Sequence, residues 1–308
     1  DKLIIAGALA NLSTSTENKI STAEFFEKLT ANNGYKYANA YSYHIYDGSN
    51  GKVQNPNLTA NLNKYKNTFN QYGGFIKHYI TEYGVSVYGG KTEETQAYRI
   101  VQQTVLMDKY GVDFSSIYNF WNTGTDSTVA NQTYGLVNND YTPKLSYYSM
   151  KNYYQNTNGS EYIGTLNIEE GLEAHVYDKE GKPLIIAWSD NTDNTYDFTL
   201  GEMTAKDIYG KDITPDESGN IQITTSPVYL YNVGNHYFYQ AISNTVTQKY
   251  DEFTSNFSGE IAKVSGLQAS IDNLKQKIQN ISSNSTLDET TAINLMEQHY
   301  NLGNTIIQ

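Results

Sequence analysis

The sequence predicts an α/β protein that continues into an antiparallel β-sandwich and ends in long helices, and three observations support this. Over the first 155 residues, short apolar strands alternate with amphipathic helices, which indicates a parallel sheet covered by helices. From Tyr162 to Val233, short strands follow one another through tight turns. After Asn235, apolar residues recur at spacings of three and four. We therefore expect three domains, at residues 1–158, 159–235 and 236–308.

Four β-α units are expected in the first part. The strands are short apolar runs, and the helices carry apolar side chains along one face. Pro143 suits the start of the last helix, and Glu93 and Glu94 suit the positive end of the helix before it. The expected strands are Lys2–Leu9, Tyr37–Tyr46, Phe75–Thr81 and Phe114–Trp121, and the expected helices are Thr22–Ala31, Asn57–Tyr72, Thr92–Tyr110 and Pro143–Tyr154.

Turn residues and helical periodicity predict the second and third parts. The segments Asp178–Lys182 and Asp216–Asn220 carry the residues of hairpin turns. The apolar series from Val246 to Ile281 predicts one helix with a coiled-coil-like seam, roughly 45 residues and about 65 Å long. A turn at Ser282–Ser285 and a capping box beginning at Thr286 predict a second helix, so the chain is expected to end in a helical hairpin suited to packing or oligomerisation. The expected sandwich strands are Leu184–Trp188, Tyr196–Leu200, Ala205–Ile208, Ile221–Thr225 and Val228–Val233.

The composition excludes several classes of function. A net charge of −12 argues against nucleic acid as a partner, because phosphate backbones require a basic surface. No run of residues approaches the roughly 20 apolar residues of a membrane-spanning helix. The sequence has no cysteine, no phosphate-binding loop and no metal-spaced histidine cluster, so we expect neither a metal nor a cofactor. Asp190–Asn194 has acidic spacing, but it lacks the glycine and terminal glutamate of an EF-hand loop and is interpreted as a turn.

Polar and aromatic residues follow three successive strands of the first part. The strand before Glu82 ends in this carboxylate and is followed by Gly84, which lets the chain turn away. The preceding strand ends with His44 and Tyr46, and the next one leads into Tyr118 and Trp121. The carboxyl ends of parallel strands meet at one edge, so we expect these side chains at one face. A carboxylate, polar rings and an aromatic surface are the groups that a sugar-cleaving site requires.

On these segments the first part resembles the second half of a clan A glycoside hydrolase barrel, most like family 39 and similar exopolysaccharide-cleaving enzymes. A small β-sandwich after the (β/α)8 TIM barrel is also typical of that family. The resemblance covers about residues 1–233. The matching segments are Ile4–Ala8, Ser42–Tyr46, Ile80–Gly84, Glu94–Tyr98, Tyr118–Trp121 and Gly135–Tyr148.

The resemblance implies a role for each residue of the site. Glu82 would be the nucleophile of a retaining double displacement, and Tyr46 would donate a hydrogen bond to it and help to hold it ionised. His44 and Tyr118 would lie near the substrate, and Trp121 would stack under the bound sugar. Retaining chemistry also needs an acid/base carboxyl group about 5–5.5 Å from the nucleophile. In this family it follows the fourth strand, which this sequence does not contain, so we expect the N-terminal half of the barrel as a partner.

Two other classes of function compete with the hydrolase. The missing acid/base, the 29 tyrosines and the long helices favour a structural surface protein built on a degenerate hydrolase fold. A carbohydrate-binding protein would instead keep Trp121 and Tyr46 as a stacking surface without hydrolysis. The substrate class implied by the resemblance predicts a protein that is secreted or held on the surface of a bacterium.

Overall fold

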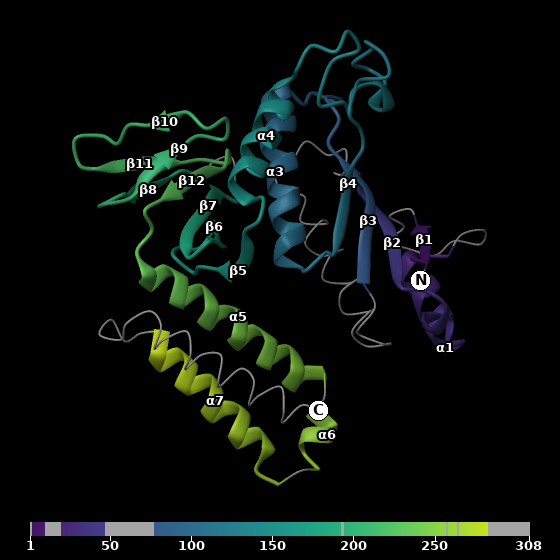
Figure 1. Cartoon of the computed structure of the whole chain (residues 1–308), viewed down its shortest axis with the longest axis vertical. Helices are drawn as coiled ribbons and strands as arrows, with labels where there is room; N and C mark the ends of the chain where they lie inside the picture. The colour runs from purple at the N-terminus through teal and green to yellow at the C-terminus, as the bar shows by residue number, and fades with distance from the viewer. Residues whose placement is uncertain are drawn as a thin grey trace. The chain divides into compact units, whose positions relative to one another are not determined.

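The computed structural model describes residues 2–9, 20–46, 77–191, 194–256, 258–263 and 265–282 (Figure 1). The chain divides into two compact units, residues 1–155 and residues 156–308. The first unit is the α/β part, and the second holds the antiparallel strands together with the C-terminal helices. The finer division into three domains stays a prediction.

The first unit is built on a four-stranded parallel sheet, as predicted. Its strands stand in chain order. The predicted strand at 37–46 begins three residues late, because Gly34–Tyr37 forms a 3-10 turn before it. The predicted strand at 114–121 is shorter than expected, because the chain leaves the sheet after residue 117. The strands are β1 (Ile5–Leu9), β2 (Ala40–Tyr46), β3 (Lys77–Gly84) and β4 (Phe114–Ile117).

Three predicted helices of the first unit are confirmed. They are α1 (Thr22–Ala31), α3 (Glu93–Lys109) and α4 (Leu145–Thr157). The Thr92 side chain caps α3 by accepting a hydrogen bond from the Thr95 amide, as a threonine at this position should. Helix α3 is attached to the sheet where the Thr104 hydroxyl lies 2.9 Å from the Tyr83 hydroxyl, both buried. The helix predicted at 57–72 lies outside the described residues.

The second unit contains the predicted antiparallel strands and three that were not individually predicted, β5, β6 and β10. A six-stranded sheet has the order β10-β9-β12-β7-β6-β5, and β11 pairs with β8. The strands are β5 (Glu161–Thr165), β6 (Leu172–Lys179), β7 (Lys182–Ser189), β8 (Tyr196–Thr199), β9 (Thr204–Lys206), β10 (Asp212–Ile213), β11 (Asn220–Ile223) and β12 (Val228–Tyr231).

Only one of the two predicted hairpin turns joins paired strands. Glu180 and Gly181 both have positive φ and connect β6 to β7, the geometry that a two-residue hairpin requires. The turn at Asp216–Asn220 forms, with the Asp216 carboxylate accepting from the Ser218 and Asn220 amides. It connects strands of different sheets, because β10 pairs with β9 and β11 pairs with β8. The hairpin prediction for this turn is therefore wrong.

The C-terminal helices form a hairpin earlier than predicted. Helices α5 (Asn235–Asn256), α6 (Ser258–Ile261) and α7 (Leu267–Ser282) replace the single continuous helix, whose prediction is wrong. The chain reverses before α7, where Gly266 has a φ of 81°, and α5 and α7 lie antiparallel side by side (Figure 1). An ion pair between Lys275 and Asp251 joins them. The second helix predicted from Thr286 lies outside the described residues.

The apolar seam of these helices is buried inside their own unit. Side chains of α5, α6 and α7, among them Val246, Tyr250 and Ile271, belong to the same core cluster as the sandwich strands. The apolar face that suggested oligomerisation is therefore covered by the chain itself. Oligomerisation stays a prediction. Within the described ranges, no helix combines the length and the apolar character that crossing a membrane would take.

Candidate functional site

Glu82 stands at the carboxyl end of β3, where the sheet brings the ends of β2 and β3 together. In the parallel register, His44 of β2 lies opposite Glu82, and Tyr46 lies opposite Gly84. The register shifts between Tyr43 and His44, where Thr81 of β3 is left without a partner on β2, so β3 carries an irregularity next to the carboxylate. This edge is the active face of parallel α/β folds, because the loops that follow the strands surround it.

Two side chains of β2 converge on one oxygen of Glu82. The Tyr46 hydroxyl donates a hydrogen bond to Glu82 Oε2, and His44 Nδ1 lies 3.3 Å from the same oxygen. Burial, and then the hydrogen bond to Glu82, raise the pKa of Tyr46 above its ordinary value, so the tyrosine remains a protonated donor at neutral pH. The Glu82 side chain is 38% exposed, which leaves it open to a ligand.

Two more tyrosines complete the surroundings of Tyr46. Its ring meets that of Tyr118 at 6.1 Å and 82°, and that of Tyr134 at 5.4 Å and 68°. Tyr118 and Tyr134 lie 5.6 Å apart at 70°, so each pair has the edge-to-face geometry that aromatic rings favour. The sequence predicted Tyr118 at this site but not Tyr134, which comes from the loop after β4. The structure thus brings His44, Tyr46 and Tyr118 together around Glu82.

Two buried polar side chains hold the loop that carries Tyr134. Gln96 of α3 is fully buried, and its Nε2 donates to Val85 O at 2.7 Å and lies 3.2 Å from Tyr134 O. Lys144, at the start of α4 and 2% exposed, donates to Gly135 O at 3.0 Å. Buried donors are found where carbonyl groups require them, so the two residues fix the loop backbone on both sides of the Tyr134 ring.

Trp121 belongs to a different part of this loop. It forms an isolated bridge with Val137, its side chain is 47% exposed, and its ring lies 6.5 Å from that of Tyr141. The chain reaches it through a cis peptide bond between Tyr118 and Asn119. The structure therefore groups Trp121 with Tyr141, whereas Tyr118 packs with the tyrosines beside Glu82.

We expect the buried Lys144 to make the stability of the first unit depend on pH. Burial lowers the pKa of Lys144 to about 8, partly offset by Glu93. The folded state therefore binds fewer protons than the unfolded state above pH 8, and the stability rises with pH until the unfolded lysine titrates. The free energy of unfolding should increase by about 2 kcal/mol from pH 7 to 9.5, relative to a Lys144→Met variant. Urea denaturation across this range measures the difference.

The matched control for this titration is Lys151→Met, at an exposed position of α4. Its pH profile should follow that of the wild type. The range stops at pH 9.5 because unfolded tyrosines, whose pKa is near 10, ionise extensively above it. If the free energy of unfolding changed with pH in the same way for the wild type and for Lys144→Met, the lowered pKa of the buried lysine would be contradicted.

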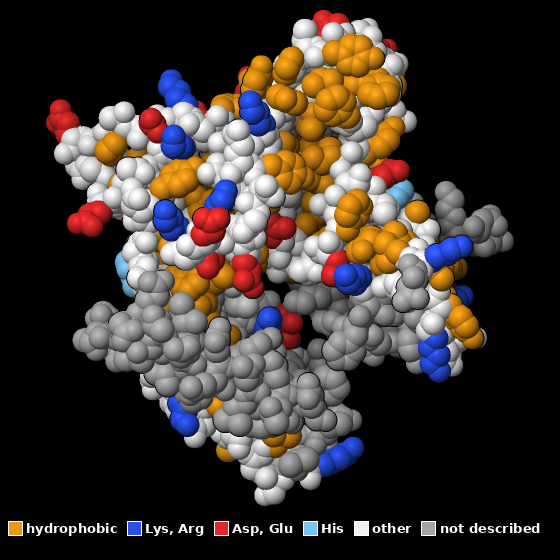
Figure 2. Space-filling model, in the orientation of Figure 1, with side chains coloured by type: hydrophobic (Ala, Val, Ile, Leu, Met, Phe, Trp, Pro, Cys, Tyr) orange, Lys and Arg blue, Asp and Glu red, His pale blue; other side chains and the backbone are white. Residues whose placement is uncertain are grey.

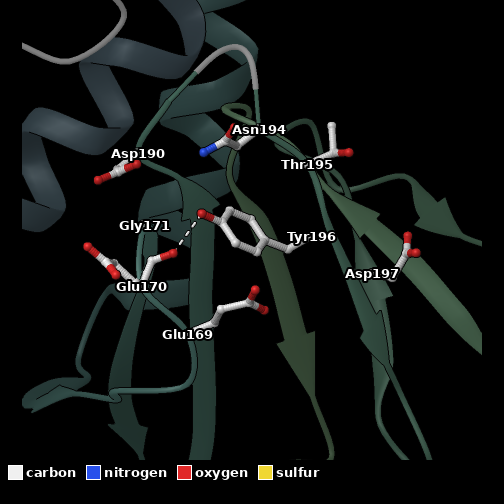
Figure 3. A pocket seen from close by; sticks show the side chains of 8 residues that line it. All are labelled: Glu169, Glu170, Gly171, Asp190, Asn194, Thr195, Tyr196 and Asp197. Atoms are coloured by element: carbon white, nitrogen blue, oxygen red, sulfur yellow. Dashed lines mark hydrogen bonds between the residues drawn. The ribbon is translucent and has the colours of Figure 1, made fainter.

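A concavity belongs to the sandwich unit (Figure 3). It has a volume of about 970 Å³, and the hydroxyl of Tyr196 points into it and donates to Glu170 O at 2.8 Å. Burial, and then Glu173 and Glu170, raise the pKa of the Asp190 carboxyl. In the part of the chain that the structure describes, no three histidine or carboxylate side chains are grouped to hold a metal ion, and none of the predicted site residues lines this concavity. Its lining residues are Glu169, Glu170, Gly171, Asp190, Asn194, Thr195, Tyr196 and Asp197.

Solved structures with a similar fold include glycoside hydrolases. No protein-family model and no curated protein matches the chain. Among solved structures it is similar to a family 39 glycoside hydrolase from the gut symbiont Bacteroides cellulosilyticus WH2, with a TM-score of 0.55 and 16% identity over 67% of this chain and 47% of that chain. It is also similar to a β-porphyranase of glycoside hydrolase family 86 from Bacteroides plebeius, with a TM-score of 0.49 and 13% identity over 73% of this chain and 46% of that one.

A third similar structure is a family 44 xyloglucanase from Paenibacillus polymyxa, with a TM-score of 0.45 and 11% identity over 75% of this chain and 57% of that one. The chain spans about half the length of the solved structures it matches. At these identities the likeness establishes the fold alone. The protein is a partial (β/α)8 barrel followed by a β-sandwich and a helical hairpin, as the sequence predicted.

Proposed function

We propose that this chain supplies the nucleophile half of a retaining glycoside hydrolase that acts on a bacterial or cell-surface polysaccharide. The observation that carries the proposal is the convergence of the Tyr46 hydroxyl and the His44 imidazole on Glu82 at the carboxyl end of β3. A carboxylate that is contacted by a tyrosine hydroxyl and an imidazole and is open to solvent has the chemistry of a glycosidase nucleophile. The family resemblance gives the same residues these roles.

Each residue has a defined task in this mechanism. Glu82 attacks the anomeric carbon and forms a glycosyl ester while the glycosidic bond breaks, and the leaving oxygen takes a proton from the acid/base carboxyl group of the other segment. Water, deprotonated by that same group, then hydrolyses the ester with net retention and frees Glu82. Tyr46 orients the attacking oxygen, since its hydroxyl bonds to Oε2 of that carboxylate. His44 and Tyr118 lie on the substrate side, and Trp121 stacks on the apolar face of a sugar ring. Because such polysaccharides lie outside the cell, we place the protein in secreted form or on the cell surface.

We propose that the acid/base carboxyl group comes from another polypeptide segment. The strands β1 and β4 form the two edges of the described parallel sheet. Apolar side chains stand exposed at both, with Ile4 and Ile5 more than 40% exposed beside β1 and Phe114 49% exposed on β4. Open edges with apolar side chains favour pairing with further strands. We propose that the N-terminal half of the barrel, in the same longer chain or as a cleaved piece, completes the site.

The test begins with the protein isolated from its own source, by native mass spectrometry and N-terminal sequencing. A longer chain or a co-purifying N-terminal piece that carries an Asn-Glu pair is expected. Incubating this complete protein with a polysaccharide panel should release reducing ends, and ¹H NMR of the first product should show the anomeric configuration of the substrate. Inverted product would exclude a nucleophilic Glu82. Binding without any release would favour the carbohydrate-binding or structural alternatives.

A further inference from the structure

We propose that the loop between β4 and α4 is a built aromatic platform for a second sugar residue, and that its polysaccharide carries no acid groups. This inference rests on the proposed function and names its substrate class. The residues that define the platform are Phe120, Trp121 and Tyr141. Figure 2 shows hydrophobic side chains gathered at the top of the view, over this loop.

Three large rings of this loop face solvent. Phe120 is 58% exposed, Trp121 47% and Tyr141 68%, and the last two form a ring pair. Single exposed apolar side chains are common on protein surfaces, whereas exposed aromatic side chains that lie close together form an apolar patch. Such patches mark interaction sites. Aromatic faces stack on the apolar C–H faces of pyranose rings, so a surface of this kind suits a sugar chain that runs past Trp121.

Hydrogen bonds hold the exposed loop in one conformation. The Asn122 side chain is buried, and its Oδ1 accepts a hydrogen bond from the Gly135 backbone amide at 2.9 Å. The backbone amide of Asn122 donates to Val137 O at 2.9 Å. Asn138 N donates to Thr142 O at 2.8 Å, and Tyr141 N donates to Asn138 O at 2.9 Å. A ligand that binds to a backbone already held in this way has little of it left to order, which favours affinity.

The backbone of Tyr141 is strained in a way that stability alone does not explain. Its φ of 66° lies in the left-handed region, which glycine and asparagine occupy at a lower cost than tyrosine. Its ring is nevertheless exposed and contributes little to burial. Strained residues of this kind cluster at active sites and ligand-binding sites. The strain and the exposure of its ring together support a ligand-binding role for Tyr141.

The charge of the loop selects against acidic sugars. Residues 111–143 contain no lysine or arginine and three aspartates. Two of these, Asp126 and Asp140, are exposed, and each carboxylate accepts from the hydroxyl and the amide of the threonine two residues later. These hydrogen bonds lower the pKa of both carboxyls, so they stay ionised at neutral pH. A negative rim repels uronate or sulfated chains and tolerates uncharged ones.

Binding of the chain to two soluble polysaccharides tests the inference without turnover: neutral konjac glucomannan and acidic polygalacturonate. Affinity electrophoresis should retard the protein on glucomannan and not on polygalacturonate. A Tyr141→Gly variant should bind glucomannan roughly 5- to 10-fold more weakly. The same change relieves the left-handed strain, so its melting temperature should stay equal or rise. Loss of binding with gain in stability separates a ligand contact from a structural role.

Two further variants complete the design. Tyr141→Phe keeps the ring and should keep binding, and Tyr37→Ala removes an exposed ring that precedes β2, at the sheet end opposite Glu82. Unchanged affinity in Tyr141→Gly, no wild-type retardation on glucomannan, or equal binding of polygalacturonate would each overturn the inference. So would burial of these rings by the N-terminal half in the complete protein. Turnover in the complete protein is measured separately, so loss of hydrolysis with binding intact contradicts only the proposed mechanism.

Discussion

Replacing Glu82 with glutamine in the complete protein is expected to lower turnover by on the order of 10⁴-fold. The amide keeps the size of the side chain and can still accept from the Tyr46 hydroxyl, so the local packing and sugar binding should be preserved. It lacks the negative oxygen that attacks the anomeric carbon, so the glycosyl ester cannot form. Initial rates of reducing-end release, together with polysaccharide affinity, measure the two effects separately.

The matched control is Glu161→Gln, an exposed glutamate of β5 in the second unit, which should leave turnover unchanged. Adding azide to a Glu82→Gly variant makes the test more specific. Azide fits the space left by the carboxylate and attacks the same carbon, so it should restore turnover and yield a glycosyl azide of inverted configuration. Retained activity in Glu82→Gln would remove Glu82 from the nucleophile role, whatever the state of the rest of the site.

Local periodicity predicted the elements of the fold well, and its failures have physical causes. The limits of α1 agree with the sequence, and Thr92 caps α3 as its residue type suggests. The helix predicted through Gly266 failed because a folded hairpin buries the same apolar face as a straight helix. The spacing of apolar residues indicates which face of a helix is buried, but it does not indicate which other element packs against that face.

The candidate site divides in the same way. His44, Tyr46 and Glu82 follow from strand ends, because parallel register places those ends at one edge. Tyr134 lies on a loop without periodicity, and its position depends on donors from α3 and α4 that are distant in the sequence. Its only signal was the neighbouring segment that resembles the family. The grouping of Trp121 with Tyr141 also follows from a loop conformation that no strand or helix pattern encodes.

Gly84 connects the fold to the site, and replacing it with alanine should be strongly destabilising. A Cβ at this position would lie 2.2 Å from Tyr118 O, a backbone atom that cannot rotate away. The chain at Tyr118 is held there, since its amide donates to Tyr83 O at 2.7 Å. Overpacking of this kind costs about 3 kcal/mol, because either β3 or β4 must shift. For a unit of this size the melting temperature should fall by about 10 °C.

The matched control is Gly259→Ala. A Cβ there meets nothing within 4 Å, and the residue lies in helix α6, so the change should be neutral or stabilising by up to about 1 kcal/mol. Thermal unfolding followed by circular dichroism compares the two variants. An unaltered melting temperature in Gly84→Ala would mean that β3 and β4 separate easily. The hydrogen bond from the Tyr118 amide to Tyr83 O would then contribute little to holding Tyr118 beside Tyr46. The tyrosines around Glu82 would be held mainly by the bonds that Gln96 and Lys144 make to the loop.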